Sequence, residues 1–339
     1  MNKPQHSLLK IGVSIGDLNG IGGEVVLRSL DHLNSFDFVP ILFANFELVI
    51  GLQETFGTHL NIAQWNVQSA FEKKTVYVID VWSEQVPIVY GTIDPRIGQY
   101  AYQSLRAATH ALKHDEVDVL LTAPIHKASI MSKEFPFPGH TNYLSRELNG
   151  TSLMLLVSDE LRVGLLTDHV PLDRVCSFIS EKLILEKAIT MKLSLQQDFG
   201  IDNPKIALLG VNPHAGDRGT IGSIDQELLT PCVAKLQSLG VQIEGPFAAD
   251  GFFGSGSYTN YDGILASYHD QGLVPFKLLS FGKGVNFTAG LNKVRVSPDH
   301  GTAFDIAGKG IACIPSCIKA FELGASVYNK RNKKKNSDY

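Results

Sequence analysis

Short apolar runs of strand length alternate with longer stretches of helical periodicity along most of this chain. The clearest helix is predicted over residues 97–114, where apolar residues recur at steps of three and four. These residues are Ile97, Ala101, Leu105, Ala108 and Leu112. The run 117–121 is apolar at nearly every position, which is typical of a strand covered on both faces. The alternation predicts an α/β fold with a largely parallel sheet.

The same patterns place the other expected elements. Strands are expected over residues 9–15, 39–44, 75–79, 117–121, 153–157, 162–166, 205–209 and 264–268. Helices are expected over residues 24–33, 97–114, 183–197, 226–239 and 316–328. Because 153–157 and 162–166 are separated by a short turn at Asp159 and Glu160, these two strands are expected to be adjacent.

The length of 339 residues exceeds what one hydrophobic core usually holds, so two domains are expected. We expect a first α/β domain formed by residues 1–128 and 300–330. Residues 129–299 would form a second α/β domain that carries metal and substrate residues. Residues 331–339 are expected to be a disordered tail, because residues 330–335 carry five positive charges.

Composition and charge exclude some classes of function. The formal net charge is −4, so no global basic field attracts nucleic acid. The sequence has no apolar stretch of the roughly 18 residues that a membrane span requires. Residues 1–7 are polar and lack the apolar region of a signal peptide. A cytoplasmic protein with a small-molecule substrate, without nucleic acid or membrane partners, is therefore expected.

Three histidines each lie where a predicted strand gives way to a loop. They are His169, His214 and His269. Ligands of open α/β sheets bind beyond the carboxyl ends of the strands, and neutral imidazole is a common metal ligand. Three such ligands with an open coordination position would form a catalytic metal site. Neighbouring Asp and Asn side chains are available to orient the rings.

Two glycine-rich segments are candidates for contact with a phosphate. Residues 16–24 follow the first predicted strand, but they match neither a GxGxxG nor a Walker pattern, and Asp17 would repel phosphate. Residues 298–310 resemble the cofactor loop of the β-decarboxylating dehydrogenases, the isopropylmalate and isocitrate group. That resemblance implies binding of the adenosine part of NAD by His300, Gly301, Thr302 and Asp305. Phe304 stands where that group has proline.

Further motifs resemble the 4-hydroxythreonine-4-phosphate dehydrogenase family. They are residues 122–127, 137–141, the three histidine motifs, 245–250, 275–277, 285–291 and 294–301. The resemblance extends from residue 16 to about residue 310 and so covers nearly the whole chain. It implies two α/β/α domains with a cleft between them, in a homodimer with the active site at the subunit interface.

The resemblance also implies roles for individual residues. His169, His214 and His269, drawn from both subunits, would hold one divalent ion: zinc, magnesium, manganese or cobalt. Residues His140, Thr141, Lys277, Asn286 and Arg295 would bind the phosphorylated substrate. Catalytic roles fall to Lys277 and, as base or orienting group, to Asp250 and Asp270. The implied reaction is oxidation of 4-phosphooxy-threonine by NAD and release of CO2, leaving 3-amino-2-oxopropyl phosphate.

Residue chemistry is consistent with that reaction. Oxidation of an alcohol removes a hydroxyl proton and a hydride, and a Lewis acid stabilises the negative charge that develops on oxygen. Lys277 and Arg295 suit phosphate and carboxylate groups, Arg by its planar fork and Lys as a point charge.

The chain departs from the family pattern near its N-terminus and at residue 126. Gly-Asp-Leu-Asn-Gly-Ile-Gly-Gly-Glu replaces the usual Gly-Asp-Pro-Ala-Gly-Ile-Gly-Pro-Glu, and His126 stands where Asn is usual. Two alternatives stay open. One is a dehydrogenase of phosphorylated threonate or erythronate, whereas the phosphate-binding residues disfavour an aromatic cis-dihydrodiol as substrate. The other is a catalytically silent protein that binds metal or nucleotide.

Overall fold

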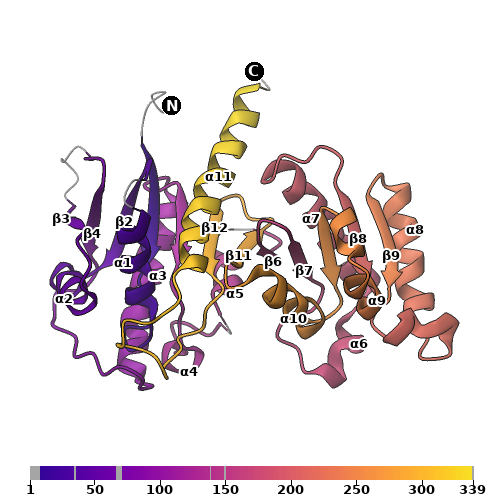
Figure 1. The fold of residues 1–339 in the computed structure, drawn as a ribbon, viewed down its shortest axis with the longest axis horizontal. Coiled ribbons are helices and arrows are strands. Elements are labelled where there is room, and N and C mark those ends of the chain that lie inside the picture. The colour runs from indigo at the N-terminus through magenta and orange to yellow at the C-terminus, as the bar shows by residue number, and fades with distance from the viewer. Residues whose placement is uncertain (1–7, 34–35, 66–70, 138, 149, 338–339) are drawn as a thin grey trace. The chain divides into compact units, whose positions relative to one another are not determined.

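A computed structural model describes residues 8–33, 36–65, 71–137, 139–148 and 150–337, and it divides into two compact units. Unit 1 comprises residues 1–149 and 292–328, and unit 2 comprises residues 150–291 and 329–339. Each unit is a mixed α/β structure (Figure 1). The expected division differs from this one, since the sequence places the boundaries at residues 128 and 300. Whereas the sequence predicts a disordered tail from residue 331, helix α11 continues to Ser337.

Unit 1 is built on parallel strands in the order β3-β4-β2-β1-β5-β12. The strands are β1 (Leu9–Ser14), β2 (Phe38–Ala44), β3 (Asn61–Gln64), β4 (Thr75–Asp80), β5 (Val119–Thr122) and β12 (Val294–Pro298). The helices are α1 (Gly22–Leu33), α2 (Phe46–Phe56), α3 (Pro95–Lys113), α4 (Lys127–Ile130), α5 (His140–Glu147) and the first part of α11 (Pro315–Ser337). The parallel sheet predicted for this part of the chain is confirmed.

Unit 2 has strands in the order β11-β6-β7-β10-β8-β9. They are β6 (Leu153–Val157), β7 (Arg162–Leu165), β8 (Lys205–Leu209), β9 (Gln242–Phe247), β10 (Gly263–Ala266) and β11 (Val285–Ala289). The pairs β11–β6 and β6–β7 are antiparallel, and the others are parallel. The expected adjacency of residues 153–157 and 162–166 is confirmed, and their short connection makes the pair antiparallel.

The helices of unit 2 are α6 (Val175–Phe178), α7 (Glu181–Gln197), α8 (Thr230–Ser238), α9 (Ala249–Gly254) and α10 (His269–Ser280). Short helical turns are η1 (Leu172–Arg174), η2 (Pro213–Gly219), η3 (Asp225–Leu229) and η4 (Ser257–Asn260). None of the helices in the described part of the chain is long and apolar enough to cross a membrane.

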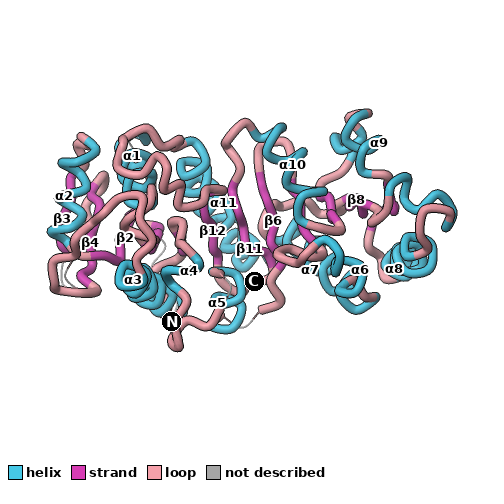
Figure 2. The backbone as a smooth tube through the Cα atoms, turned by 90° about the horizontal axis from the view of Figure 1, so that it is seen from below, coloured by secondary structure: helices cyan, strands magenta, loops and turns pink. Residues whose placement is uncertain are grey.

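Helices cover both faces of the strands in each unit. Figure 2 shows α1 and α3 on opposite sides of the unit 1 strands, and α10 and α7 on opposite sides of the unit 2 strands. The packing around β7 explains this arrangement, because successive residues of a strand point to opposite faces. A Cβ added to Gly164 would lie 2.6 Å from Met191 of α7, whereas Gly272 of α10 packs against Val163 and Leu165. Both faces are therefore buried, as the apolar strands predict.

Helix boundaries follow from local chemistry. Asp94 precedes α3, its side chain accepts the backbone N–H of Arg96, and Pro95 occupies the first helical position. Ser180 caps α7 in the same way by accepting from Leu183. The predicted helix 97–114 is observed as Pro95–Lys113.

Candidate functional site

Two of the three predicted histidines meet in unit 2. His169 follows β7 and His269 begins α10 directly after β10, and these two strands are parallel neighbours. The strand ends are tied together because Thr167 Oγ1 donates to the carbonyl of Ser267 at 2.8 Å. The two imidazole centroids lie 5.7 Å apart, and both side chains are partly exposed. The carboxyl edge of this sheet thus presents a pair of imidazoles to solvent.

A carboxylate lies beside each of the two rings, and the carboxylate of Asp270 is within hydrogen-bond distance of its ring. His269 Nδ1 lies 2.7 Å from Asp270 Oδ1, and His169 Nδ1 lies 3.8 Å from Asp168 Oδ2. Hydrogen bonding to His169 is the main cause that lowers the pKa of Asp168 to about 2. A proton kept on Nδ1 leaves the lone pair on Nε2, which is the arrangement that outer carboxylates impose on metal-binding histidines.

Lys187 is a neighbour of this site that the sequence analysis did not single out. It lies on α7 and donates a hydrogen bond to the carbonyl of Ser152. Burial lowers the pKa of its ammonium, and the charge of Asp168 partly offsets that effect. Because it lies in the middle of a helix, 19 residues after Asp168 and outside any motif, its proximity to Asp168 had no signal in the sequence.

His214, the third predicted ligand, follows β8 and is exposed on the turn η2. Among the residues that the structure describes, no group of three or more His, Cys, Asp or Glu side chains lies close enough to hold a metal ion. One chain therefore brings together two of the three expected ligands. Imidazole nitrogen is a donor that suits zinc or cobalt, so two of the ligands that such an ion takes lie together here.

The remaining predicted residues of unit 2 lie on separate elements. Asp250 is exposed near the start of α9, and Lys277 is exposed on α10. Asn286 is half-buried on β11. Asp270, a predicted catalytic carboxylate, lies within hydrogen-bond distance of the neighbouring His269 imidazole.

Unit 1 holds a buried cation beside a half-buried imidazole. Arg295 on β12 is 2% exposed, and its guanidinium donates to Thr122 Oγ1 at 2.6 Å. Burial lowers the pKa of Arg295 to about 9, so it remains cationic at neutral pH. His140 begins α5 next to Thr141, and its Nε2 is buried with no hydrogen-bond partner among the residues that the structure describes. A cation next to an unsatisfied imidazole nitrogen is suited to an anion that contacts both.

The histidine of this pair titrates below its usual range. Burial, and then the charge of Arg295, lowers the pKa of His140 well below 6.5. On acidification the unfolded chain therefore protonates His140 at a higher pH than the folded chain does. Proton binding then favours the unfolded state, so the free energy of unfolding should fall as the pH drops below about 6.5. We expect His140→Asn to lose less stability than the wild type between about pH 7 and pH 5. Urea unfolding at several pH values measures the free energy of unfolding of both proteins. The same dependence of this free energy on pH in the variant and the wild type would contradict the expectation.

The predicted cofactor segment forms a loop after β12. The carbonyl of Thr302 accepts the backbone N–H of Ile21 at 3.0 Å, and Lys309 Nζ donates to the carbonyl of Asp305 at 2.7 Å. Phe304 packs against the ring of His126, with 5.1 Å between centroids. Gly308 fits closely against Tyr90, because an added Cβ would lie 2.4 Å from that ring. His300 is half-buried and Gly301 is exposed at the start of the loop.

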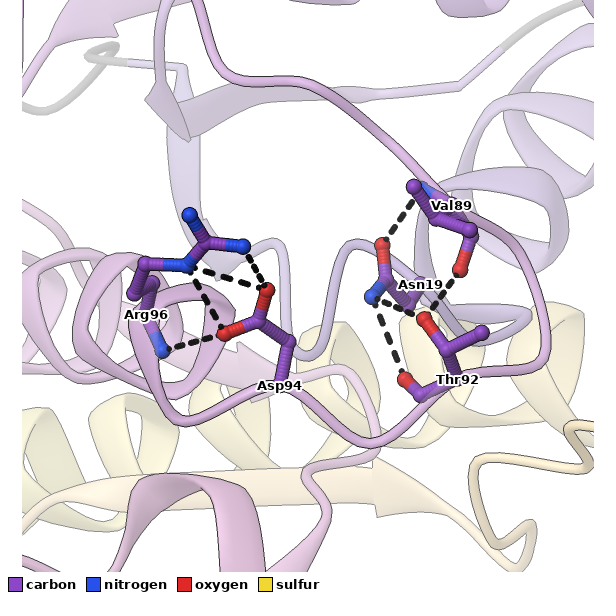
Figure 3. Close-up of polar contacts among 5 residues, drawn as sticks. All are labelled: Asn19, Val89, Thr92, Asp94 and Arg96. Carbon is purple, nitrogen blue, oxygen red and sulfur yellow. Dashed lines mark hydrogen bonds and ion pairs between the residues drawn. The ribbon is translucent and has the colours of Figure 1, made fainter.

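Asn19 links this loop region to residues 89–92, a segment without a motif in the sequence (Figure 3). Its Oδ1 accepts the backbone N–H of Val89 at 2.9 Å, and its Nδ2 donates to the carbonyl and hydroxyl of Thr92 at 3.1 and 3.0 Å. Its own carbonyl accepts from Gly91. Asn19 is 1% exposed and stands where the family pattern has alanine. Asn19 therefore anchors the segment whose Tyr90 contacts Gly308.

Replacement of Asn19 by alanine should loosen this anchor. Because the variant leaves Val89 N–H and Thr92 C=O without their partner, we expect the free energy of unfolding to fall by about 1–3 kcal/mol. Thr92→Val, which keeps the bond between Asn19 and the carbonyl, should lose less. Denaturant titrations of both variants measure the difference. Equal stability of Asn19→Ala and the wild type would contradict the anchoring role.

The chain matches the family model described as pyridoxal phosphate biosynthetic protein PdxA over residues 39–324. It is 40% identical over 334 residues to 4-hydroxythreonine-4-phosphate dehydrogenase from Bacteroides thetaiotaomicron, covering 98% of this chain and 92% of the relative. A solved 4-hydroxythreonine-4-phosphate dehydrogenase from Klebsiella pneumoniae superposes with a TM-score of 0.82 at 30% identity, covering 95% and 100% of the two chains. A terephthalate 1,2-cis-dihydrodiol dehydrogenase from Burkholderia xenovorans has a TM-score of 0.62 at 25% identity, covering 94% and 98%.

Proposed function

This chain belongs to the family of the pyridoxal phosphate biosynthetic protein PdxA, and from that premise we propose that it is a 4-hydroxythreonine-4-phosphate dehydrogenase. The proposed reaction oxidises 4-phosphooxy-L-threonine, with NAD as hydride acceptor, and releases CO2 to leave 3-amino-2-oxopropyl phosphate. Among the observations on the chain itself, the buried Arg295 beside His140 supports it best. Such a pair suits a phosphorylated substrate better than an uncharged dihydrodiol.

We assign anion binding to unit 1. The guanidinium of Arg295 offers a planar fork of donors to phosphate oxygens. His140 is neutral at neutral pH because its pKa is depressed. In the neutral tautomer that carries its proton on Nε2, this nitrogen can donate a hydrogen bond to the bound anion. Thr141 adds a hydroxyl, and Lys277 and Asn286 of unit 2 are further proposed substrate-binding residues.

We assign the metal ligands to unit 2. His169 and His269, with His214, would hold a divalent cation, which supplies Lewis acidity that lowers the pKa of an alcohol. Asp270 Oδ1 is positioned to keep the proton of His269 on Nδ1, and Asp168 lies 3.8 Å from the Nδ1 of His169. Asp250 and Lys277 are the proposed groups for proton transfer to and from the substrate.

The cofactor loop supports a dinucleotide of the NAD type. His300, Gly301, Thr302 and Asp305 are the proposed contacts to its adenosine end. We also propose that the enzyme acts in the cytoplasm as a homodimer with the active site at the subunit interface. Analytical ultracentrifugation with and without substrate measures the assembly state directly.

Kinetics on matched substrates test the proposed function. The purified protein, supplied with Co2+ and NAD, is assayed with 4-phosphooxy-L-threonine and with 4-phospho-D-erythronate, which lacks the amino group. We expect the amino acid phosphate to give the higher kcat/KM. A higher value for the sugar acid phosphate would replace the proposed substrate, and NADH from neither would contradict the proposed activity.

A further inference from the structure

The turn that carries His214 has an unusual backbone. Six consecutive residues, 214–219, have positive φ angles of 53°, 50°, 78°, 39°, 55° and 91°. Only Gly216 and Gly219 among them are glycines. The left-handed conformation is unfavourable for each of the other four residues, because Cβ approaches the following carbonyl oxygen. Residues held in this way persist only where the surrounding structure determines them, and such residues cluster at functional sites.

The carboxylate of Asp225 holds the backbone that leads into this turn. It is fully buried and begins the π-helical turn η3. Its Oδ1 accepts the backbone N–H of Val211 at 2.7 Å, and its Oδ2 accepts the backbone N–H of Asn212 at 3.2 Å and Asn212 Nδ2 at 2.8 Å. One carboxylate thus fixes the two residues that lead from β8 into Pro213 and His214. Bonds to an ionised acceptor are the stronger kind, which suits this restraint.

Three glycines allow the chain to close around that carboxylate. A Cβ on Gly210 would lie 2.8 Å from Asp225 Oδ1, and one on Gly216 would lie 2.7 Å from the carbonyl of Gly222. A Cβ on Gly222 would lie 2.7 Å from Asn212 Nδ2. All three positions lack room for a side chain, so the turn and the carboxylate fit each other tightly.

The geometry points to Asp225 as a positioning residue for His214. The rings of His169 and His269 lie beside carboxylates next to them in the sequence, whereas the backbone that leads into His214 is held by a carboxylate eleven residues later. Loss of the Asp225 carboxylate releases Val211 and Asn212, and the left-handed turn then relaxes and moves His214. The inference rests on the proposed function, because it takes His214 to be a metal ligand.

The test compares Asp225→Asn with Asp262→Asn in the full-length protein. Asn at residue 225 has one acceptor oxygen for three donors and turns an amide N–H2 toward another N–H. Asp262 is the matched control, since it also accepts a backbone N–H, that of Lys205 at 2.8 Å, away from the turn. Two quantities are measured: Co2+ affinity by calorimetry, and hydrogen exchange at the amides of Val211 and Asn212.

We expect Asp225→Asn to bind Co2+ about 10–100-fold more weakly and to exchange both amides faster, whereas Asp262→Asn resembles the wild type in both. Gly216→Ala is the second variant in case Asp225→Asn fails to fold. It keeps the carboxylate, strains the turn through its new Cβ, and should weaken Co2+ binding in the same direction. Wild-type Co2+ affinity in a folded Asp225→Asn, or in Gly216→Ala where only that variant folds, would overturn the inference.

Different results would contradict the metal-binding role of His214 and the positioning role of Asp225. If the wild type itself binds no Co2+, the proposed metal role of His214 is contradicted and the inference falls with it. If the wild type binds Co2+ and the variants bind it equally well, only the role of Asp225 is contradicted. Unchanged exchange at Val211 and Asn212 in Asp225→Asn would likewise show that the carboxylate does not hold the turn.

Discussion

His269→Ala is expected to lose about a thousandfold or more in kcat while remaining folded. His269 is partly exposed at the first position of α10, so truncation leaves no large cavity in the core. Its proposed role is to hold a divalent ion, and a Lewis acid contributes several kcal/mol to the transition state of alcohol oxidation. A loss of about 4 kcal/mol corresponds to about a thousandfold in rate. Steady-state NADH formation measures the loss in kcat, and the metal content per chain measures the loss of the ion.

A matched control separates loss of the site from a general effect of removing an imidazole. His59 is exposed in unit 1 and has no proposed role, so His59→Ala should retain the wild-type kcat and metal content. Circular dichroism checks that both variants are folded. If folded His269→Ala retains a kcat within about tenfold of the wild type, the imidazole pair does not form the metal site.

Arg295→Met should lose about 100–1000-fold in kcat/KM for the phosphorylated substrate and only modestly in stability. A guanidinium that binds phosphate through two charge-assisted hydrogen bonds contributes about 3–4 kcal/mol. Methionine is similar in length and fills the same space, but it removes the hydrogen bond to Thr122 Oγ1. The free energy of unfolding should therefore fall by about 1–3 kcal/mol, which leaves the protein folded. Substrate kinetics and urea unfolding of one preparation test both expectations.

Arg96→Met is the matched control for this substitution. Arg96 lies in the same unit, and its exposed side chain pairs with Asp94 (Figure 3). Exposed ion pairs contribute little, so we expect changes below about 1 kcal/mol in stability and unchanged kinetics. If Arg295→Met is strongly destabilised and its kcat/KM is normal, Arg295 is a structural residue and anion binding lies elsewhere.

The fold could be predicted where apolar periodicity was undisturbed. The predicted helix at 97–114 and the strands predicted over residues 9–15, 39–44, 75–79 and 117–121 are observed because their burial patterns are regular. Strand β12 was not expected, because Arg295 interrupts its apolar pattern even though that side chain is buried. Helix α10 was not expected either, since Gly272 and Pro275 lie inside it. In both places packing against neighbouring elements outweighed the local signal.

The residue types of the candidate site could be predicted from the sequence, but the residues that hold them in place could not. Histidines at strand ends were visible in the sequence, and the rings of His169 and His269 lie 5.7 Å apart, whereas their role as metal ligands stays a prediction. The contacts of Asn19 with residues 89–92 and of Asp225 with Val211 join positions far apart or without a motif. These contacts depend on loop conformations, among them a left-handed turn that L-residues adopt only under tertiary restraint.

We propose that this chain couples oxidation and decarboxylation of a phosphorylated hydroxyamino acid to reduction of NAD. The most direct test supplies the Co2+-loaded protein with 4-phosphooxy-L-threonine and NAD and follows NADH and CO2 in the same reaction. We predict that both form in equal amounts and that both require substrate phosphate. A folded protein that binds metal and NAD yet forms neither product would contradict the account.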